Sequence, residues 1–270
     1  MNPSTKLFYV EVQEPDMHEP SGDLERLITA LAEQWDLHGV RVDLHILQTM
    51  QPILRKGEWK VTVAVHLGDA ENPPRIMHIW PGYYDGTVYG LAVDLGSTTI
   101  AAHLCDLQSG EVVASSGIMN PQIRFGEDLM SRVSYSMMNA GGDKEMTRAV
   151  REGMNALFVQ IASEAEIDKD LIVDAVFVCN PVMHHLFRGI NPIELGQAPF
   201  ARATSNAMRL RADDLGLNIH PAARVYLVPC IAGHVGADAA AVALSESPNT
   251  SEDLVLVVDV GTNAEILLGN

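Results

Sequence analysis

The sequence has few cysteines, and no two of them lie close together. Cys105, Cys179 and Cys230 are the only cysteines, and no C-x-x-C pair is present. A disulfide framework or an all-cysteine metal site needs clustered and usually even-numbered cysteines. We therefore expect reduced, buried thiols and no iron–sulfur cluster within this chain.

Basic residues and long apolar runs are also scarce. The chain has 18 Lys and Arg against 35 Asp and Glu, which gives a formal net charge of −17. Nucleic-acid binding depends on clustered Lys and Arg that displace counterions, so a nucleic acid is excluded as the main partner. No apolar run reaches the roughly 20 residues needed to cross a bilayer, and the start "MNPSTK" does not resemble a secretion signal. We expect a cytoplasmic protein with no membrane partner.

The first part of the chain, residues 1–86, has the pattern of a small α+β domain. Its predicted elements are a strand at 6–12, a helix at 23–37, a helical segment at 44–57 and strands at 59–67 and 75–80. Pro52 lies within the second helical segment and is expected to kink or split it. The Pro- and Gly-containing stretch 81–86 is the predicted hinge into the next domain.

From residue 87 onward the order of elements changes to that of an α/β protein. The predicted elements are strands at 88–95, 98–106 and 111–118, helices around 125–138 and at 143–165, a strand at 174–180, a short helix at 181–187, a strand at 223–229 and a helix from about Gly236. The stretch between 188 and 222 shows no clear period. With 47% hydrophobic residues, the chain has enough apolar side chains for a sizeable core.

The stretch "YGLAVDLGSTTI", residues 89–100, combines a buried strand with a polar turn. The apolar run 91–93 lacks polar alternation, which predicts a strand buried on both faces and places Asp94 at the strand end. Main-chain N–H groups at a turn containing Gly96 can hold phosphate oxygens, and an aspartate can hold the accompanying magnesium. For a single D-x-G-[ST] pattern, an ordinary turn is the commoner explanation.

A second copy of this pattern occurs in "VLVVDVGTNAEI", residues 255–266. Asp259 corresponds to Asp94, Gly261 to Gly96 and Thr262 to Ser97. A duplicated phosphate turn predicts two related lobes that face one another across a ligand. Because the second copy begins close to Asn270, we expect the sequence to be part of a longer protein. Since a lone hairpin is only marginally stable, residues 254–270 should pair with the preceding domain, pair with another chain, or fray.

Two further polar residues lie at predicted element ends. Asp238 stands at a helix start beside Gly236, where N–H groups and the helix dipole favour a negative charge. Its alternative role is a first-turn acid that only stabilises the helix. Asn180 ends a strand where a ligand cleft of an α/β sheet would lie, but a turn-forming Asn before Pro181 explains it nearly as well.

Two other polar groups are given no catalytic role. His184 and His185 are adjacent on a predicted helix and point about 100° apart, so they are interpreted as packing or surface residues. The stretch "NPQIRFGEDLMSR", residues 120–132, could line a cleft or receive a partner, but a solvated helix start with local ion pairs is the favoured interpretation.

Several motifs, in order, resemble the ATP-dependent reductive activators of corrinoid proteins, a family with the ATPase core of actin, sugar kinases and heat-shock chaperones. They are "GLAVDLGSTT", "NPQIRFGEDLMSR", "CNPVMHHLF", "APF", "RVYLVPCIAGHVGADA" and "VVDVGTNAEILLGN". The resemblance implies an α/β, ribonuclease H-like lobe behind a small α+β domain. It implies a small middle domain at 1–86, the first ATPase lobe at 87–253 and the opening strands of the second lobe at 254–270.

The resemblance also implies the ligands and their residues. Asp94 and Asp259 would organise magnesium through water, and Asp238 would serve as the catalytic residue. The implied ATP-binding residues are Asp94, Gly96, Ser97, Thr98, Thr99, Asn180, Gly236, Asp259, Gly261, Thr262 and Asn263. A [2Fe–2S] cluster would belong to a ferredoxin-like domain outside this chain.

The function implied is part of an activator that returns Co(II) corrinoid proteins of a methyltransferase system to Co(I). A homodimer is compatible with the sequence. Two alternatives stay open: a small-molecule kinase of the same superfamily, in which Asp238 deprotonates a substrate hydroxyl, and a non-enzymatic interaction module whose acidic surface docks a partner.

Overall fold

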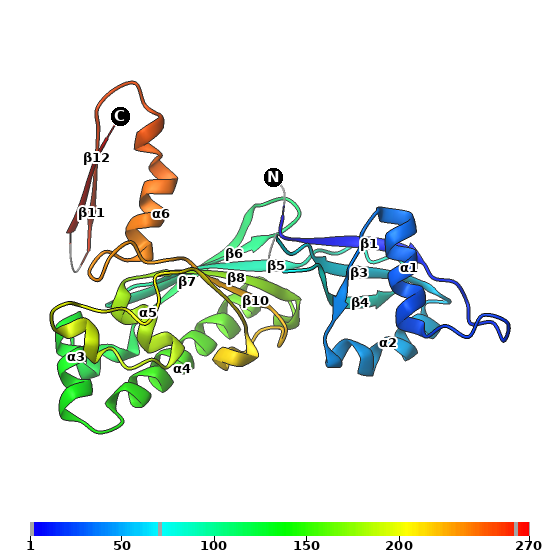
Figure 1. The fold of residues 1–270 in the computed structure, drawn as a ribbon, viewed down its shortest axis with the longest axis horizontal. Helices are drawn as coiled ribbons and strands as arrows, with labels where there is room; N and C mark the ends of the chain where they lie inside the picture. Colours follow the sequence, from blue (N-terminus) through cyan, green and yellow to red (C-terminus); the bar gives the residue numbers. More distant parts are fainter. Residues whose placement is uncertain (1–2, 70–71, 262–263, 270) are drawn as a thin grey trace. The chain divides into compact units, whose positions relative to one another are not determined.

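The computed structural model describes residues 3–69, 72–261 and 264–269. By internal packing the chain forms two compact units, which are described separately. Unit 1 comprises residues 1–90 together with 105–112 and 171–174, and unit 2 comprises the remainder. Both units combine helices with sheets (Figure 1), so the predicted α/β class is confirmed.

Unit 1 contains a four-stranded sheet in the order β1-β3-β4-β2. Its elements are β1 (Thr5–Glu11), α1 (Asp23–Trp35), β2 (Arg41–Val42), α2 (Leu44–Lys56), β3 (Lys60–His66) and β4 (Arg75–Pro81). Strand β3 pairs antiparallel with β1 and with β4, whereas β2 runs parallel to β4. Of the two predicted effects of Pro52, a kink or a split, the split is wrong, because α2 continues through Pro52. Buried Met50 and Leu54 lie on either side of Pro52 and tie both halves of the helix to one core.

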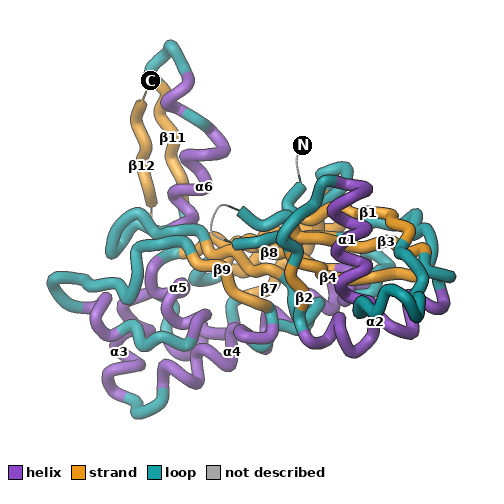
Figure 2. Tube along the Cα trace, turned by 45° about the vertical axis from the view of Figure 1, so that its right-hand side comes forward, coloured by secondary structure: helices purple, strands orange, loops and turns teal. Residues whose placement is uncertain are grey.

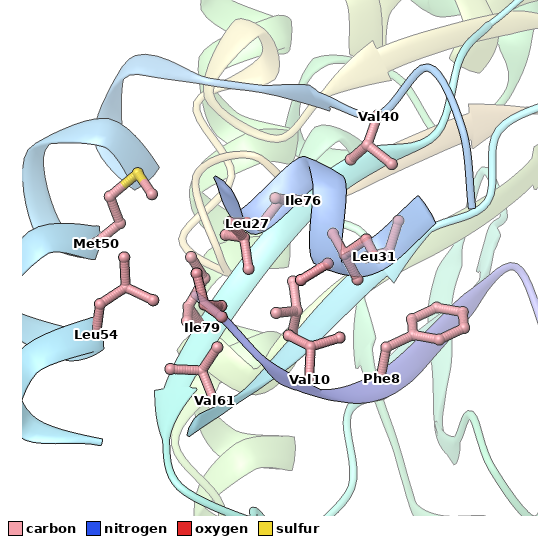
Figure 3. Close-up of a cluster of buried hydrophobic side chains, with 14 of the residues drawn as sticks. Phe8, Val10, Leu27, Leu31, Val40, Met50, Leu54, Val61, Ile76 and Ile79 are labelled. Carbon is pink, nitrogen blue, oxygen red and sulfur yellow. The ribbon is translucent and has the colours of Figure 1, made fainter. Parts of the chain in front are cut away.

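The core of unit 1 lies between the two helices and the sheet (Figure 3). Leu27 and Leu31 of α1 and Leu54 of α2 are fully buried against Val10 and Val61 of the strands. The apolar spacing of both helices in the sequence predicted these buried faces, since residues three or four apart share one side of a helix.

Unit 2 is built on a six-stranded sheet in the order β7-β6-β5-β8-β10-β9. The strands are β5 (Tyr89–Leu95), β6 (Thr99–Asp106), β7 (Val112–Met119), β8 (Ile172–Cys179), β9 (Met208–Arg211) and β10 (Arg224–Leu227). Strand β9 pairs antiparallel with β10 and lies within the stretch for which the sequence predicted no element.

Helices cover one face of this sheet. They are α3 (Leu129–Met138), α4 (Gly142–Glu164) and α5 (Pro181–Arg188), which lie on the same side in both views (Figures 1 and 2). The Phe177 ring of β8 lies 6.4 Å from that of Phe158 on α4 and 4.7 Å from that of Phe187 on α5.

The opposite face of the six-stranded sheet is open. Ala92 of β5 is exposed between buried Leu91 and Val93, and Val176 of β8 is 40% exposed. The prediction that β5 is buried on both faces is therefore wrong. Alternate side chains of a strand point to opposite faces, and in the described part of the chain the helices cover only one of them.

The last elements form a hairpin beside a helix. Strands β11 (Val255–Val260) and β12 (Ala264–Gly269) pair antiparallel in a sheet of their own, next to α6 (Ala237–Glu246) in both views (Figures 1 and 2). For residues 254–270 the sequence predicted pairing with the preceding domain, pairing with another chain, or fraying; in the described residues β11 and β12 instead pair with one another and not with the six-stranded sheet. Within the described ranges, no helix is both long and apolar enough to span a membrane.

Candidate functional site

The first Asp-x-Gly turn joins β5 to β6. Asp94 is the last polar residue of β5 and remains accessible to solvent on the open face of the sheet. A Cβ atom on Gly96 would lie 2.5 Å from the Thr99 carbonyl oxygen, closer than any side chain allows. The turn therefore requires glycine for close packing, as the sequence pattern indicated.

Two helix starts meet near this turn. The Asn180 side chain caps α5 by accepting a hydrogen bond from the Met183 N–H at 2.9 Å. A Cβ atom on Gly236 would lie 2.5 Å from the Asn180 Cα, so the start of α6 lies directly against the end of β8. Asp238 is in the first turn of α6, where its carboxylate accepts from the Ala239 N–H at 2.9 Å. Asn180 and Asp238 thus make the local helix contacts expected if they served only to stabilise the chain. Both residues also line the cavity described next.

The two turns and the two helix starts surround one cavity of about 200 Å³, here called the acidic cavity. It is lined by Asp94, Gly96, Ser97, Thr98, Thr99, Asn180, Asp238, Asp259, Gly261 and Glu265. Gly236 is not among these lining residues, but it packs directly against the Asn180 backbone. Two further predicted residues, Thr262 and Asn263, lie outside the described residues.

The carboxylates of the acidic cavity repel one another. Burial raises the pKa of Asp94, and the charges of Asp238 and Asp259 raise it further. Burial and the charge of Asp259 also raise the pKa of Asp238, against two backbone hydrogen bonds that lower it. The pKa of Glu265 is raised by burial and by the same two aspartates. A bound cation would relieve this repulsion.

The acidic cavity has the donor chemistry of a magnesium site, since hard cations take oxygen ligands and magnesium keeps several of its waters. In the part of the chain that the structure describes, no group of three or more His, Cys, Asp or Glu residues is arranged to hold a metal directly. Coordination through water by Asp94 and Asp259 stays a prediction.

The segment 120–132 differs from its predicted form. Asn120, Gln122 and Arg132 are fully buried, so the interpretation as a solvated segment is wrong for these residues, whereas Glu127, Asp128 and Ser131 at the start of the helix are exposed. A 3₁₀ turn at Pro121–Phe125 precedes α3, which begins only at Leu129. The polar side chains are buried because each has hydrogen-bond partners inside the unit, which offsets the loss of water.

The two adjacent histidines and two of the three cysteines are buried, as predicted. His184 and His185 are 1% and 2% exposed, and burial, followed by the charge of Arg188, lowers the pKa of His184 to about 3. Cys179 and Cys230 are buried, Cys105 is half-buried, and all three are free thiols.

Comparison with known protein families covers both units. Residues 1–86 match the family described as "RACo linker region", and residues 89–248 match the family described as "RACo middle region". The chain belongs to the RACo family.

Individual proteins similar to this chain are consistent with its membership of the RACo family. The chain is 35% identical over 183 residues to "Corrinoid activation enzyme RamQ" of Eubacterium limosum, which covers 68% of this chain and 30% of that protein. It is 25% identical over 194 residues to "[Co(II) methylated amine-specific corrinoid protein] reductase" of Methanosarcina barkeri, which covers 67% of this chain and 34% of that protein.

A solved structure shares the fold of this RACo-family chain. The "Reductive activator for corrinoid,iron-sulfur protein" matches with a TM-score of 0.87 and 32% identity, over 99% of this chain and 42% of that chain. The chain spans about a third of the length of the curated relatives it matches.

Sequence reasoning missed two parts of the site in this RACo-family chain. Glu265 pairs across the hairpin with Asp259, which an expected hairpin around Gly261 could have indicated. Asn120 follows the third strand of a meander, and its N–H donates to the Thr98 carbonyl at 2.8 Å. The end of a third strand returns to the edge at which the first strand ended, and this topology could have placed Asn120 beside the turn.

Proposed function

We propose that this chain is part of an ATP-dependent reductive activator that returns the Co(II) form of a corrinoid protein to Co(I). The observation that carries the proposal is the acidic cavity, where both copies of the Asp-x-Gly turn meet Asp238. The names of the relatives, which describe corrinoid activation and Co(II) corrinoid protein reduction, support the choice of substrate.

The proposed fold of unit 2 is a ribonuclease H-like ATPase lobe, with β11 and β12 as the start of a second lobe. Its support is the repeat of strand, Asp-x-Gly turn and strand, once as β5 and β6 and again as β11 and β12. Two such turns facing one cavity are what a nucleotide phosphate chain held from both sides requires.

The residues of the acidic cavity have separate proposed roles. Asp94 and Asp259 hold magnesium through water, and the N–H and hydroxyl groups of the first turn hold phosphate oxygens. Asp238 orients the attacking water. When bound, magnesium would neutralise phosphate charge. The crowding of carboxylates in the cavity supports a cationic occupant, because Asp94, Asp238 and Glu265 have pKa values that the charge of Asp259 helps to raise.

Nucleotide binding would bias the protein toward the conformation that permits reduction, because a ligand shifts an equilibrium only through its different affinities for the two states. The reduction itself adds one electron to Co(II). We propose that this electron comes from a [2Fe–2S] domain that is not part of this chain, and that the partner is the corrinoid protein of a methyltransferase system in the cytoplasm. The proposal is compatible with a homodimer.

The first test is the change Asp94→Ala in the protein as the cell makes it. We expect ATP-dependent formation of Co(I), followed by the corrinoid absorbance, to fall to the rate seen without ATP, because magnesium and the phosphates lose a ligand in the cavity. The matched control is Asp253→Ala, which removes an exposed aspartate from the loop before β11. Normal activation by Asp94→Ala would overturn the assignment.

One observation favours the kinase alternative. A second cavity of about 620 Å³ shares Glu265 with the acidic cavity and is lined by Asp128, Leu129, Met130, Pro181, Val182, Leu195, Gly233, His234, Val235, Ala264 and Glu265. A small acceptor bound there would have to extend past Glu265 into the acidic cavity to reach Asp238, which is the base in this alternative. ATP consumption that depends on an added small molecule, and not on a corrinoid protein, would favour this function. Failure of the protein to bind Mg-ATP while it binds a partner would favour the interaction module.

A further inference from the structure

The first phosphate turn is held from behind by segment 120–132. Three consecutive carbonyl oxygens of the turn accept hydrogen bonds from this segment. The Asn120 side-chain amide donates to the Gly96 carbonyl at 2.8 Å, and the Asn120 main-chain N–H donates to the Thr98 carbonyl at 2.8 Å. The Arg132 guanidinium donates to the Ser97 carbonyl between them. The orientation of three successive peptide planes is therefore set by two residues.

This anchoring determines where the N–H groups of the turn point. In a trans peptide the carbonyl of one residue and the N–H of the next point in opposite directions. With the carbonyls of residues 96–98 directed at Asn120 and Arg132, the N–H groups of residues 97–99 are directed away from segment 120–132. Residues 96–99 also line the acidic cavity. The anchored carbonyls thus aim donors at the proposed phosphate position.

Arg132 also brings charge to the turn. It is fully buried, and its remaining hydrogen bonds go to neutral acceptors: the Gly126 carbonyl at 3.0 Å, the Gln122 side-chain carbonyl at 3.2 Å and the Met183 sulfur at 2.9 Å. Burial lowers the pKa of Arg132 to about 10, while the negative charge of Asp128 raises it in part. The guanidinium therefore stays positive at neutral pH. A buried arginine whose hydrogen-bond acceptors are all neutral makes the local potential positive behind a turn that faces several carboxylates.

We propose that Asn120 and Arg132 are positioning residues of the nucleotide site, which orient the first turn for phosphate and supply a positive potential behind it. This inference rests on the proposed function. It assigns a positioning role to segment 120–132, for which no catalytic function was predicted from the sequence. Neither side chain lines the acidic cavity, so both residues act through the peptide planes of the turn.

The test compares two probes, Mg-ADP and adenosine, in the protein as the cell makes it. Adenosine carries no phosphate, so its affinity reports on the rest of the nucleotide site. For Arg132→Met we expect the Mg-ADP dissociation constant to rise tenfold or more and the adenosine constant to stay within twofold. Arg132→Lys, which keeps the charge but not the planar fork, should recover part of the loss.

Arg151→Met is the matched control. Arg151 is a half-buried arginine of the same unit whose guanidinium donates to the Phe187 carbonyl of α5 at 2.9 Å. We expect its ratio of Mg-ADP to adenosine affinity to equal that of the unchanged protein. If Arg132→Met does not fold, Asn120→Ala serves as the test variant. It removes the side-chain donor to the Gly96 carbonyl and should lower the ratio of Mg-ADP affinity to adenosine affinity.

The outcomes separate the two claims. If the unchanged protein binds no Mg-ADP, the proposed function fails. Suppose instead that the unchanged protein binds Mg-ADP. The positioning role is then overturned if the Arg132 and Asn120 variants keep the ratio of Mg-ADP affinity to adenosine affinity, whether their affinities stay unchanged or fall equally for both ligands.

Discussion

The two Asp-x-Gly turns share a sequence pattern but lie in different surroundings. Before the first turn, Leu91 and Val93 of β5 are 2% and 3% exposed. At the corresponding positions before the second turn, Leu256 and Val258 of β11 are 61% and 49% exposed. The same apolar run before an Asp-x-Gly turn therefore builds a core strand in one copy and a strand with an exposed apolar face in the other.

The difference shows what a short motif determines. In both copies the aspartate is the penultimate residue of a strand and a glycine follows the strand directly, so the local conformation follows from the residues. The burial depends on which elements cover the strand. Helices cover the inner face of β5, whereas β11 and β12 pair mainly with each other, next to α6 and the turn at Pro248–Thr250.

The largest expected effect concerns the strands themselves. Leu91→Ala should lower the free energy of unfolding by about 2–5 kcal/mol, because it leaves a cavity in a packed core. Leu256→Ala should change it by less than about 0.5 kcal/mol, since the side chain is exposed. Urea denaturation of both variants measures the difference. Equal losses would show that β11 is as well packed as β5.

A smaller effect is expected at the glycines. Gly96→Ala should destabilise the protein by about 1–3 kcal/mol, because its Cβ would meet the Thr99 carbonyl at 2.5 Å. Gly269→Ala in β12 is the control, since its Cβ would come no closer than 4.0 Å to Pro248. The control should stay within about 0.5 kcal/mol. Thermal melts compare the two, and a Gly96→Ala protein as stable as the control would contradict the tight packing of the first turn.

The smallest effect is a pH dependence of the first turn. The folded-state pKa of Asp94 is raised above its ordinary value of 3.8, so the folded state binds the proton more tightly than the unfolded state. Its contribution to stability is present below pH 3.8 and is lost as the pH rises through the raised pKa. Asn cannot ionise, so the Asp94→Asn variant does not lose this contribution. Its stability relative to the unchanged protein should therefore increase as the pH rises through the raised pKa of Asp94.

The expected gain is below about 1 kcal/mol, because Asp94 is accessible to solvent. Urea denaturation at acidic and neutral pH measures it, with Asp253→Asn as the control for the loss of an exposed charge. A gain that is the same at both pH values would contradict the raised pKa.

Much of the fold and part of the site could be predicted from the sequence. The apolar periods predicted α1 and α4, and the runs of apolar residues predicted β5, β6 and β8, because these signals are local. The duplicated turn predicted that residues as distant as Asp94 and Asp259 would meet, and the structure places both on the acidic cavity. Strand β9 was missed because a short edge strand depends on its neighbour more than on its own residues.

The sequence by itself determined the two turns, the strands that lead into them and the helix starts at Asn180 and Asp238, because glycine, aspartate and helix-capping residues act over a few positions of chain. Only the tertiary structure decided that β5 has an open face and that Asn120 and Arg132 are buried. Burial of a polar side chain depends on partners such as the carbonyls of the first turn, which lie more than twenty residues away along the chain and are brought near only by the packing of the sheet.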